Sequence, residues 1–287
     1  KSYSVIEREP IKLNFLGAEL TMAPPPSSGG TTIGSVLNIL SEFDFLGMSF
    51  SEKVHLITES MRRAFKDRAF YLGDPDFVDV PIGKLISKEY ASKLAESINL
   101  DKATPIHEED EIDGSIGWNE GAHTTHFSIL DNNGNRAAVT QTINTWFGSG
   151  YMLPSSGLIL NNEMDDFASK PLSPNSYGLI HGEQNSIQPN KRMLSSMTPT
   201  FIESDRGIAI LGTPGGARII SMVLLSIIDY LTGGDAQSMT ASKRFHHQFL
   251  PDVIRYEKDA FTNDVKEDLQ MKGHNLQEIS NYGNMQV

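Results

Sequence analysis

Apolar residues in the first hundred positions recur at intervals of three and four, the spacing of one helix face. This pattern predicts helices over 31–43, 51–71 and 87–98. The second is the strongest: Ser51 can cap its start, and its buried face is expected to contain Val54, Ile57, Met61 and Phe65. Residues 1–30 are expected to form strands and turns. They end in PPPSSGG, which we expect to be a hinge, rigid at the prolines and flexible at the glycines.

Residues 101–122 are acidic and poor in large apolar side chains, and we expect an exposed linker there. After it the period changes to two, which predicts strands over 123–131 and 136–144 around the turn NNGN. The remaining pattern predicts strands over 157–161, 200–203 and 207–211, a long loop over 170–192, and helices over 217–231, 235–244 and 262–272. This order indicates a layered α/β or α+β fold with an antiparallel sheet.

The amino-acid composition and charge exclude several classes of function. The 287 residues include 39% hydrophobic ones, enough for a sizeable core. The net charge of −12 argues against a nucleic-acid partner, because phosphate binding needs clustered Lys and Arg. The apolar run 219–228 is too short to span a membrane, so no span is expected. The absence of cysteine excludes disulfides, thiolate metal sites and Cys nucleophiles.

Thr124 opens the first strand of the second part, directly after the acidic linker. Thr is a good strand former, and that alone explains its presence. A second hypothesis is that the chain is cut between His123 and Thr124. A new N-terminal Thr would carry its own base, because its α-amine, with a pKa near 8, lies close to its hydroxyl. His126 is less suited as a base, since no orienting partner is evident.

Gly215 and Gly216 lie in the segment GTPGGA, between a predicted strand and an apolar helix. Backbone N–H groups at a helix N-terminus can bind an anion or the oxyanion of an acyl-transfer intermediate. A tight turn that requires glycine is the alternative. No Lys-Ser/Thr pair follows, so the segment is not a P-loop.

Three other polar segments are candidates for binding. Residues 161–166 (NNEMDD) can bind an ammonium group or calcium, or cap a turn, and their spacing does not fit an EF-hand. Residues 189–199 combine basic groups with two serines and can hold a carboxylate or form a turn. The pair His246 and His247 suits packing better than metal binding, because adjacent helical residues diverge by about 100°.

Eight stretches in this order resemble the γ-glutamyltransferase (γ-glutamyltranspeptidase) family of N-terminal-nucleophile hydrolases. They are MAPPPSSGG (22–30), YLGDPDF (71–77), TTHFSILDNNGN (124–135), TQTINTWFGSG (140–150), SGLILNNEMDDF (156–167), PNKRMLSSMTP (189–199), GTPGGARII (212–220) and RFHHQFLPD (244–252). Together they extend over nearly the whole chain.

The resemblance implies a role for individual residues. Thr124 would be the nucleophile, freed by self-cleavage through an N-to-O acyl shift, with Thr142 hydrogen-bonded to it. Gly215 and Gly216 would form the oxyanion hole. The α-amino group of the glutamyl substrate would bind Asn144, Glu163 and Asp166, and its α-carboxylate Ser195 and Ser196. Residues 171–182 would form a lid over the site, with Tyr177 at its gating position. The family's carboxylate-binding Arg would come from a part of the large subunit before Lys1.

The resemblance also implies an architecture: an α+β, four-layer αββα sandwich, present here as a partial chain. Residues 1–123 would be the C-terminal part of the large subunit, and 124–287 a small catalytic subunit without its C-terminal end. The expected activity is γ-glutamyl transfer and hydrolysis. Its substrates would be glutathione or another γ-glutamyl compound, with an amino acid, peptide or water as acceptor. No cofactor or metal is expected, and the family's location implies a periplasmic or secreted protein.

Three alternatives remain open at this point. One is a different acyl chemistry on the same scaffold, such as cephalosporin deacylation or poly-γ-glutamate cleavage. Another is a binding protein without activity, although Thr124, Thr142 and both glycines argue against it. The third is a calcium or other metal ion at 161–166.

Overall fold

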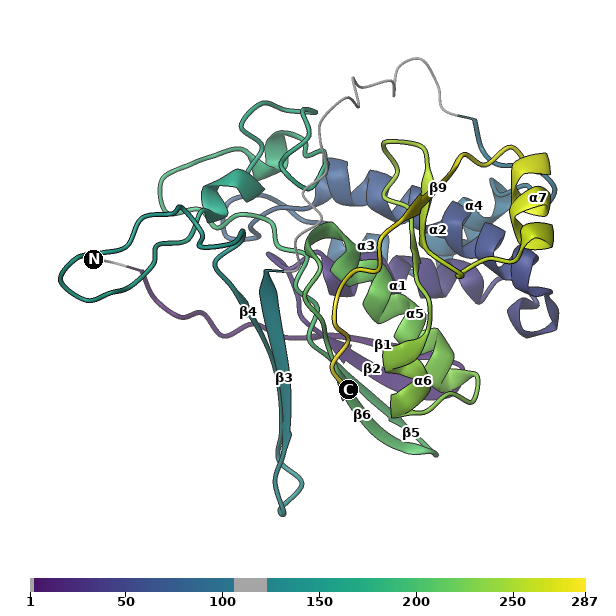
Figure 1. Ribbon diagram of the computed structural model, residues 1–287, viewed down its shortest axis with the longest axis horizontal. Coiled ribbons are helices and arrows are strands. Elements are labelled where there is room, and N and C mark those ends of the chain that lie inside the picture. Colours follow the sequence, from purple (N-terminus) through teal and green to yellow (C-terminus); the bar gives the residue numbers. More distant parts are fainter. Residues whose placement is uncertain (1–2, 106–122) are drawn as a thin grey trace.

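A four-stranded antiparallel sheet forms the centre of the molecule (Figure 1). The computed structural model describes residues 3–105 and 123–287, so most of the expected acidic linker lies outside the described residues. The strand order is β1-β2-β5-β6, with bounds Ile11–Phe15, Ala18–Met22, Thr200–Ser204 and Gly207–Leu211. In the centre of the sheet, β2 pairs with β5 from Glu19↔Glu203 to Met22↔Thr200. The sheet therefore joins strands from both sides of the 123–124 bond.

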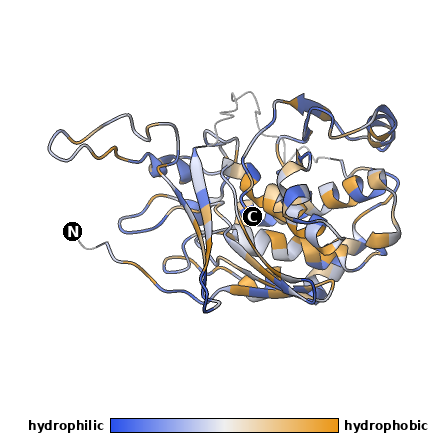
Figure 2. Cartoon of the chain, turned by 60° about the horizontal axis from the view of Figure 1, so that its bottom comes forward, coloured by the Kyte–Doolittle hydropathy of each residue, from blue (hydrophilic) through white to orange (hydrophobic). Residues whose placement is uncertain are grey.

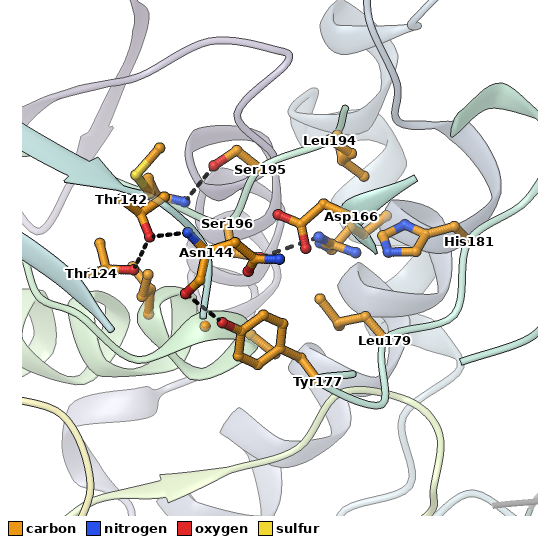
Figure 3. A pocket seen from close by; sticks show the side chains of 15 residues that line it. Thr124, Thr142, Asn144, Asp166, Tyr177, Leu179, His181, Leu194, Ser195 and Ser196 are labelled. Atoms are coloured by element: carbon orange, nitrogen blue, oxygen red, sulfur yellow. Dashed lines mark hydrogen bonds between the residues drawn. The ribbon is translucent and has the colours of Figure 1, made fainter. Parts of the chain in front are cut away.

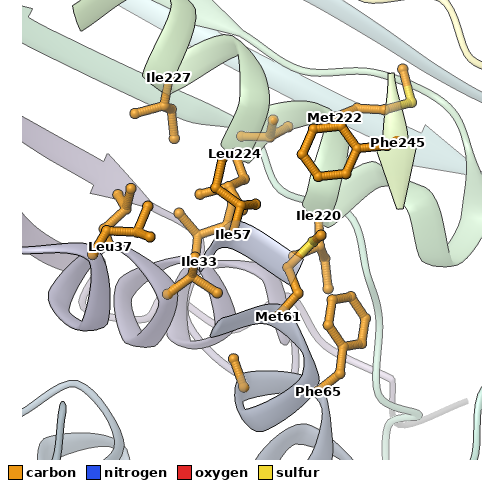
Figure 4. Packing of buried hydrophobic residues seen from close by; sticks show 14 of the residues in the cluster. Ile33, Leu37, Ile57, Met61, Phe65, Ile220, Met222, Leu224, Ile227 and Phe245 are labelled. Atoms are coloured by element: carbon orange, nitrogen blue, oxygen red, sulfur yellow. The ribbon is translucent and has the colours of Figure 1, made fainter. Parts of the chain in front are cut away.

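Helices pack on one face of this sheet. Their bounds are α1 Gly29–Leu40, α2 Phe50–Tyr71, α3 Ile82–Leu85, α4 Lys88–Glu96, α5 Ile219–Leu231, α6 Ala236–Ala241 and α7 Asn263–Met271. All twelve residues of α1 are buried, because α1 is in contact with β1, β2, α2, α4 and α5. Figure 4 shows the core that results, with Ile33 and Leu37 of α1 among side chains of α2 and α5. In Figure 2, hydrophobic residues gather where helices and sheet meet.

A second sheet is the hairpin of β3 (Thr124–Leu130) and β4 (Arg136–Thr142). It lies against β5 and β6: the Ser128 hydroxyl donates to the Ile210 carbonyl of β6 at 3.2 Å, and Arg136 pairs with Glu203 of β5 at 2.7 Å. Glu203 alternates with the buried Ile202, so this contact is on the sheet face opposite the helices. Helices, sheet and hairpin are thus three successive layers, as expected of a partial αββα sandwich in the α+β class.

Most predicted elements are confirmed within about two residues. The hairpin, the strands β5 and β6, and the helices α4 and α7 lie where the pattern indicated. The loop 170–192 contains no strand or helix longer than the 3-10 turn Glu183–Asn185. Other predictions are wrong. Ser49, not Ser51, caps α2 through a capping box with Glu52. Residues 157–161 form no regular strand: they face residues 149–153 through a few backbone hydrogen bonds and the isolated bridge Met152↔Ile159.

The expected hinge is not flexible. Ser28, Gly29 and Gly30 are buried, and the two glycines are the first residues of α1. A Cβ atom on Gly29 would overlap the side chain of Thr198, and one on Gly30 would lie 2.6 Å from the Ala23 carbonyl oxygen. Glycine is required here for close packing rather than for mobility.

A third sheet, which the sequence pattern did not predict, consists of β7 (Phe245–His246), β8 (Ile254–Glu257) and β9 (Leu276–Ile279). Helix 235–244 was predicted too long, since α6 ends at Ala241 and the chain enters β7. These strands have two to four residues, too few to establish a period of two. Within the described ranges, no helix combines the length and apolar character that a membrane crossing requires.

Glu59 of α2 connects distant parts of the chain. Its buried carboxylate accepts hydrogen bonds from Arg62, Arg63 and Thr104, the last in the described start of the expected linker. Burial alone would raise the pKa of Glu59, but these partners, with Arg62 strongest, lower it to about 2. The ionised carboxylate therefore stabilises the fold.

The first prediction concerns pH. The pKa of Glu59 falls from an ordinary 4.5 to about 2 on folding, so its contribution is present above pH 4.5 and is lost as the pH falls toward 2. We expect this contribution to be about 3 kcal/mol. Glu59→Gln should therefore lose more stability at pH 7 than at pH 2.5 in urea unfolding. Glu89→Gln, at an exposed site on α4, is the control and should change little. An equal loss for Glu59→Gln at both pH values would contradict this account.

A second prediction tests the packing of α1. Gly29→Ala should lower the free energy of unfolding by about 1–3 kcal/mol through overpacking against Thr198. Gly83→Ala is the matched control, because a Cβ at Gly83 meets nothing within 4 Å. It should be neutral or slightly stabilising. Denaturant titration compares the two; similar values for both would refute the packing argument.

Candidate functional site

Thr124 and Thr142 face each other at the open end of the hairpin. The strand register pairs them directly, and cross-strand neighbours on one face have adjacent side chains. The Thr124 hydroxyl donates to Thr142 Oγ1 at 3.2 Å, and the backbone N–H of Asn144 donates to the same oxygen at 2.9 Å. Thr142 thus orients the hydroxyl of Thr124 (Figure 3).

A cavity adjoins Thr124 and brings together most of the residues expected at the site. Its volume is about 30 Å³, room for about two water molecules. Of the sequence-predicted residues, the lining includes Thr124, Thr142, Asn144, Asp166, Tyr177, Ser195, Ser196 and Gly216. Gly215 and Glu163 are not part of it, but each adjoins it: Gly215 precedes Gly216, and Glu163 interacts with Asp166.

Tyr177 lines this cavity and contacts two neighbouring segments of the chain. Its hydroxyl donates to the Asn144 carbonyl at 3.0 Å, and its backbone N–H donates to the Asn175 side chain at 3.0 Å. The ring lies so close to Gly216 that a Cβ there would be 2.5 Å from it. Asn144 and Gly216 both have positive φ, 75° and 56°. Tyr177 is therefore held between the backbone after β4 and the turn before α5.

One wall of the cavity is acidic. Asp166 belongs to the 3-10 helix Glu163–Asp166, in which Glu163, Asp165 and Asp166 are close together. Burial raises the pKa of Asp166 well above its ordinary value, and the charges of Glu163 and Asp165 raise it further. Burial also raises the pKa of Glu163. Such a cluster favours a cationic group, which would relieve both burial and repulsion.

Ser195 and Ser196 also line the cavity, and the PPPSSGG segment holds them in place. The Ser195 N–H donates to the Pro26 carbonyl at 2.8 Å, and the Ser28 N–H donates to the Ser195 carbonyl at 2.7 Å. The chain start and the serine segment thus form a short parallel bridge, Ser27↔Ser195.

Arg68 of α2 is a site residue that the sequence analysis missed. It is 2% exposed and lines the cavity. Its Nε donates to Ser28 Oγ at 2.9 Å and its Nη2 to Ser196 Oγ at 3.2 Å. Burial lowers the pKa of Arg68 to about 10, opposed by the charge of Asp166, so it is cationic at neutral pH. Its spacing from Met61 and Phe65 puts it on the apolar face of the helix. A charged residue at such a position was the feature of the sequence that could have indicated a buried site residue.

A second cavity of about 500 Å³ shares Thr124 and Thr142 with the first. Its lining also includes His123, Gln141 and Trp146, and the rings of His123 and Trp146 are 4.7 Å apart. Thr124 therefore borders both a narrow polar cavity and a wider, open one.

The other histidines considered in the sequence, His126, His246 and His247, make packing and hydrogen-bond contacts within the fold. His126 does have partners, contrary to the expectation: its Nδ1 is 2.7 Å from Thr140 Oγ1 and its ring packs on Gly212. His246 is buried beside Ser221 and Gln248, in β7 rather than in a helix. His247 contacts Asp252. No group of three or more His, Cys, Asp or Glu side chains suited to a metal ion occurs in the described part of the chain.

Comparison with known proteins gives consistent matches. The family model described as Gamma-glutamyltranspeptidase matches residues 1–287. The Glutathione hydrolase proenzyme of Escherichia coli (strain K12) is 43% identical over 279 residues, 96% of this chain and 48% of that protein. The chain thus spans about half the length of the curated relatives it matches.

Comparison with solved structures gives matches to the same family and to a related fold. A mutant γ-glutamyltranspeptidase of Helicobacter pylori is 41% identical, with a TM-score of 0.55 over 56% of this chain and 88% of that one. A cephalosporin acylase from Bacillus halodurans has a TM-score of 0.76 over 95% of this chain and 46% of that one. At 22% identity this second likeness concerns the fold alone.

The contact of Tyr177 with Gly216 generates a third prediction. Gly216→Ala combines the cost of a side chain at φ 56° with a clash against the ring. Gly150→Ala, at φ 69° with nothing within 4 Å, carries only the backbone cost of about 1–2 kcal/mol. In denaturant unfolding, we expect Gly216→Ala to lower the free energy of unfolding by about 1–3 kcal/mol more than Gly150→Ala does. Tyr177→Ala in the same chain should remove this excess; an unchanged excess would mean that the ring is not its source.

Proposed function

This chain belongs to the γ-glutamyltranspeptidase family, and on that premise we propose that it is the catalytic portion of a γ-glutamyltransferase and glutathione hydrolase. Cleavage before Thr124 would yield fragments 1–123 and 124–287 of one precursor, a zymogen. The observation that carries the proposal is the hydroxyl of Thr124, which borders a cavity lined by the acidic Asp166, the cationic Arg68 and the hydroxyls of Ser195 and Ser196.

These lining groups fit the head group of a free γ-glutamyl compound. Its α-ammonium would bind the carboxylates of Asp166 and Glu163 with the amide of Asn144, and its α-carboxylate the hydroxyls of Ser195 and Ser196 beside Arg68. The γ-carbonyl carbon would then lie at Thr124. An acyl group without an α-amino acid head would leave the acidic wall unpaired, which argues against the acylase alternative.

The chemistry is acyl transfer in two steps. Once the chain is cut, the Thr124 hydroxyl attacks the γ-carbonyl carbon and its proton passes to the Thr124 α-amine. The N–H groups of Gly215 and Gly216 stabilise the oxyanion, and the intermediate collapses as the C–N bond breaks and the leaving amine takes the proton. Water or an acceptor amine then cleaves the γ-glutamyl ester. The wider cavity at Trp146 suits the leaving group and the acceptor.

Substrate entry requires a conformational change. The narrow cavity holds about two water molecules, less than a glutamyl head group needs. Tyr177 is the side chain that would move, because a single hydrogen bond to the Asn144 carbonyl and contact with Gly216 hold it over the cavity. The family's location supports a periplasmic or secreted protein.

The fourth prediction tests this function. Thr124→Ala in the full-length protein should remain one uncut chain without activity, because both the cleavage and the ester need the hydroxyl. Ser128→Ala, farther along the same strand and outside the lining of both cavities, should be cut and active. Intact mass with N-terminal sequencing measures the cut, and release of p-nitroaniline measures turnover.

The outcome that would refute the proposal is normal cleavage of Thr124→Ala, or turnover by a wild-type chain whose 123–124 bond is intact. Rates with γ-glutamyl-p-nitroanilide and glutaryl-p-nitroanilide separate the transferase from an acylase. We expect the donor that lacks the α-amino group to react at least about 100-fold more slowly, the value of one charged hydrogen-bonded contact.

A further inference from the structure

His181 is a buried residue of the narrow cavity for which neither the fold nor the proposed chemistry provides a role. It is 1% exposed and lines the cavity together with Arg68, Asp166 and Ser196. Within the described residues, neither of its ring nitrogens has a hydrogen-bond partner. Figure 3 shows its ring at the end of the cavity away from Thr124.

The position of His181 is fixed by its backbone. The Leu172 N–H donates to the His181 carbonyl at 2.8 Å, and the N–H of the next residue, Gly182, donates to the Ala69 carbonyl at 2.7 Å. The second bond attaches the loop to the last turn of α2, one residue from Arg68. The loop thus holds the imidazole and the guanidinium at the same end of the cavity.

An unpaired buried imidazole is costly, since each unsatisfied polar group loses about 1–3 kcal/mol of hydration. Buried polar groups are otherwise almost always paired, and an exception requires an explanation. A neutral imidazole has one N–H donor and one acceptor nitrogen. A ligand in the cavity that accepts a hydrogen bond would pair the donor.

The charge around His181 decides which ligand group this is. Burial, and then the charge of Arg68, lower the pKa of His181 well below its ordinary value, so the ring is neutral. Arg68 beside it repels an ammonium and attracts an anion. The hydroxyls of Ser195 and Ser196 can donate to the same anion. Asp166 of the acidic cluster lines the same cavity and is the place for a cation.

We propose that His181 is a specificity-determining residue that donates a hydrogen bond from its ring to the α-carboxylate of the γ-glutamyl donor. The carboxylate is bound between the hydroxyls of Ser195 and Ser196, the charge of Arg68 and the imidazole. His181 thereby favours donors with a free α-carboxylate over donors in which this group is an amide. This inference rests on the proposed function and deepens it.

The fifth prediction is a change in substrate preference. His181→Phe keeps a ring of similar size but removes both nitrogens, and His181→Gln restores a donor. For γ-glutamyl-p-nitroanilide, we expect His181→Phe to lower kcat/KM by about 10- to 100-fold, mainly through KM. For the analogue with an α-carboxamide, the change should be under about 3-fold, because a neutral amide gains less from the donor. His181→Gln should recover part of the preference.

The full-length, cleaved enzyme is used throughout, and its fragments and unfolding midpoint are checked in each variant. An equal loss of kcat/KM for both donors indicates a structural role of His181 and overturns the inference, as does no change for either donor.

Calorimetric binding of L-glutamate and its α-carboxamide to the same variants separates this inference from the proposed function. One possible outcome is that the wild-type protein shows no turnover but binds glutamate, and that His181→Phe weakens this binding at least about 10-fold. This outcome would refute the proposed function and support the contact between His181 and the carboxylate. Wild-type protein that binds no glutamate would overturn both.

Discussion

The buried cation of Arg68 is the constraint on which the arrangement of the site depends. A guanidinium removed from water is stable only if surrounding groups accept its hydrogen bonds and balance its charge. Here Ser28, Ser196 and the charge of Asp166 do so, and they come from three separate segments. The start of α1, the serine segment and the 3-10 helix Glu163–Asp166 therefore converge on the end of α2. The cavity beside Thr124 is the space between them.

Much of the fold could be predicted from the sequence because local and tertiary preferences agree. The hairpin has alternating side chains and a strong turn, so β3 and β4 were predicted nearly to the residue, and the pairing of Thr124 with Thr142 follows from that register. The helix α2 has one long apolar face, and only its cap was misplaced, by two residues. The local pattern gave a wrong prediction at 157–161, where an apolar run forms only an isolated bridge instead of a strand. It also missed β7–β9, whose strands are too short to show a period of two.

The site could be predicted only where family resemblance supplied residue roles. Resemblance named the two threonines, the glycines and the serines, and the structure brings most of them to one cavity. The roles of Arg68 and His181 depend on tertiary contacts instead. Arg68 occupies a helical position that pattern assigns to the core, and His181 lies in a loop without periodicity, where nothing local distinguishes a cavity-facing side chain. The covering of Gly216 by Tyr177 likewise joins residues far apart in the chain.

The pairing of β2 with β5 has a consequence for a chain that is cut at 123–124. Fragment 1–123 would contain β1 and β2, and fragment 124–287 would contain β5 and β6, so the cut would not interrupt any strand of the sheet. Separation of the two fragments would break the backbone hydrogen bonds between β2 and β5 and expose the core beneath the helices. The unpaired edges of β2 and β5 would then be exposed to water, where such edges promote aggregation. Such a cut would therefore add two chain ends without creating two domains, because the two fragments would still share one sheet and one core.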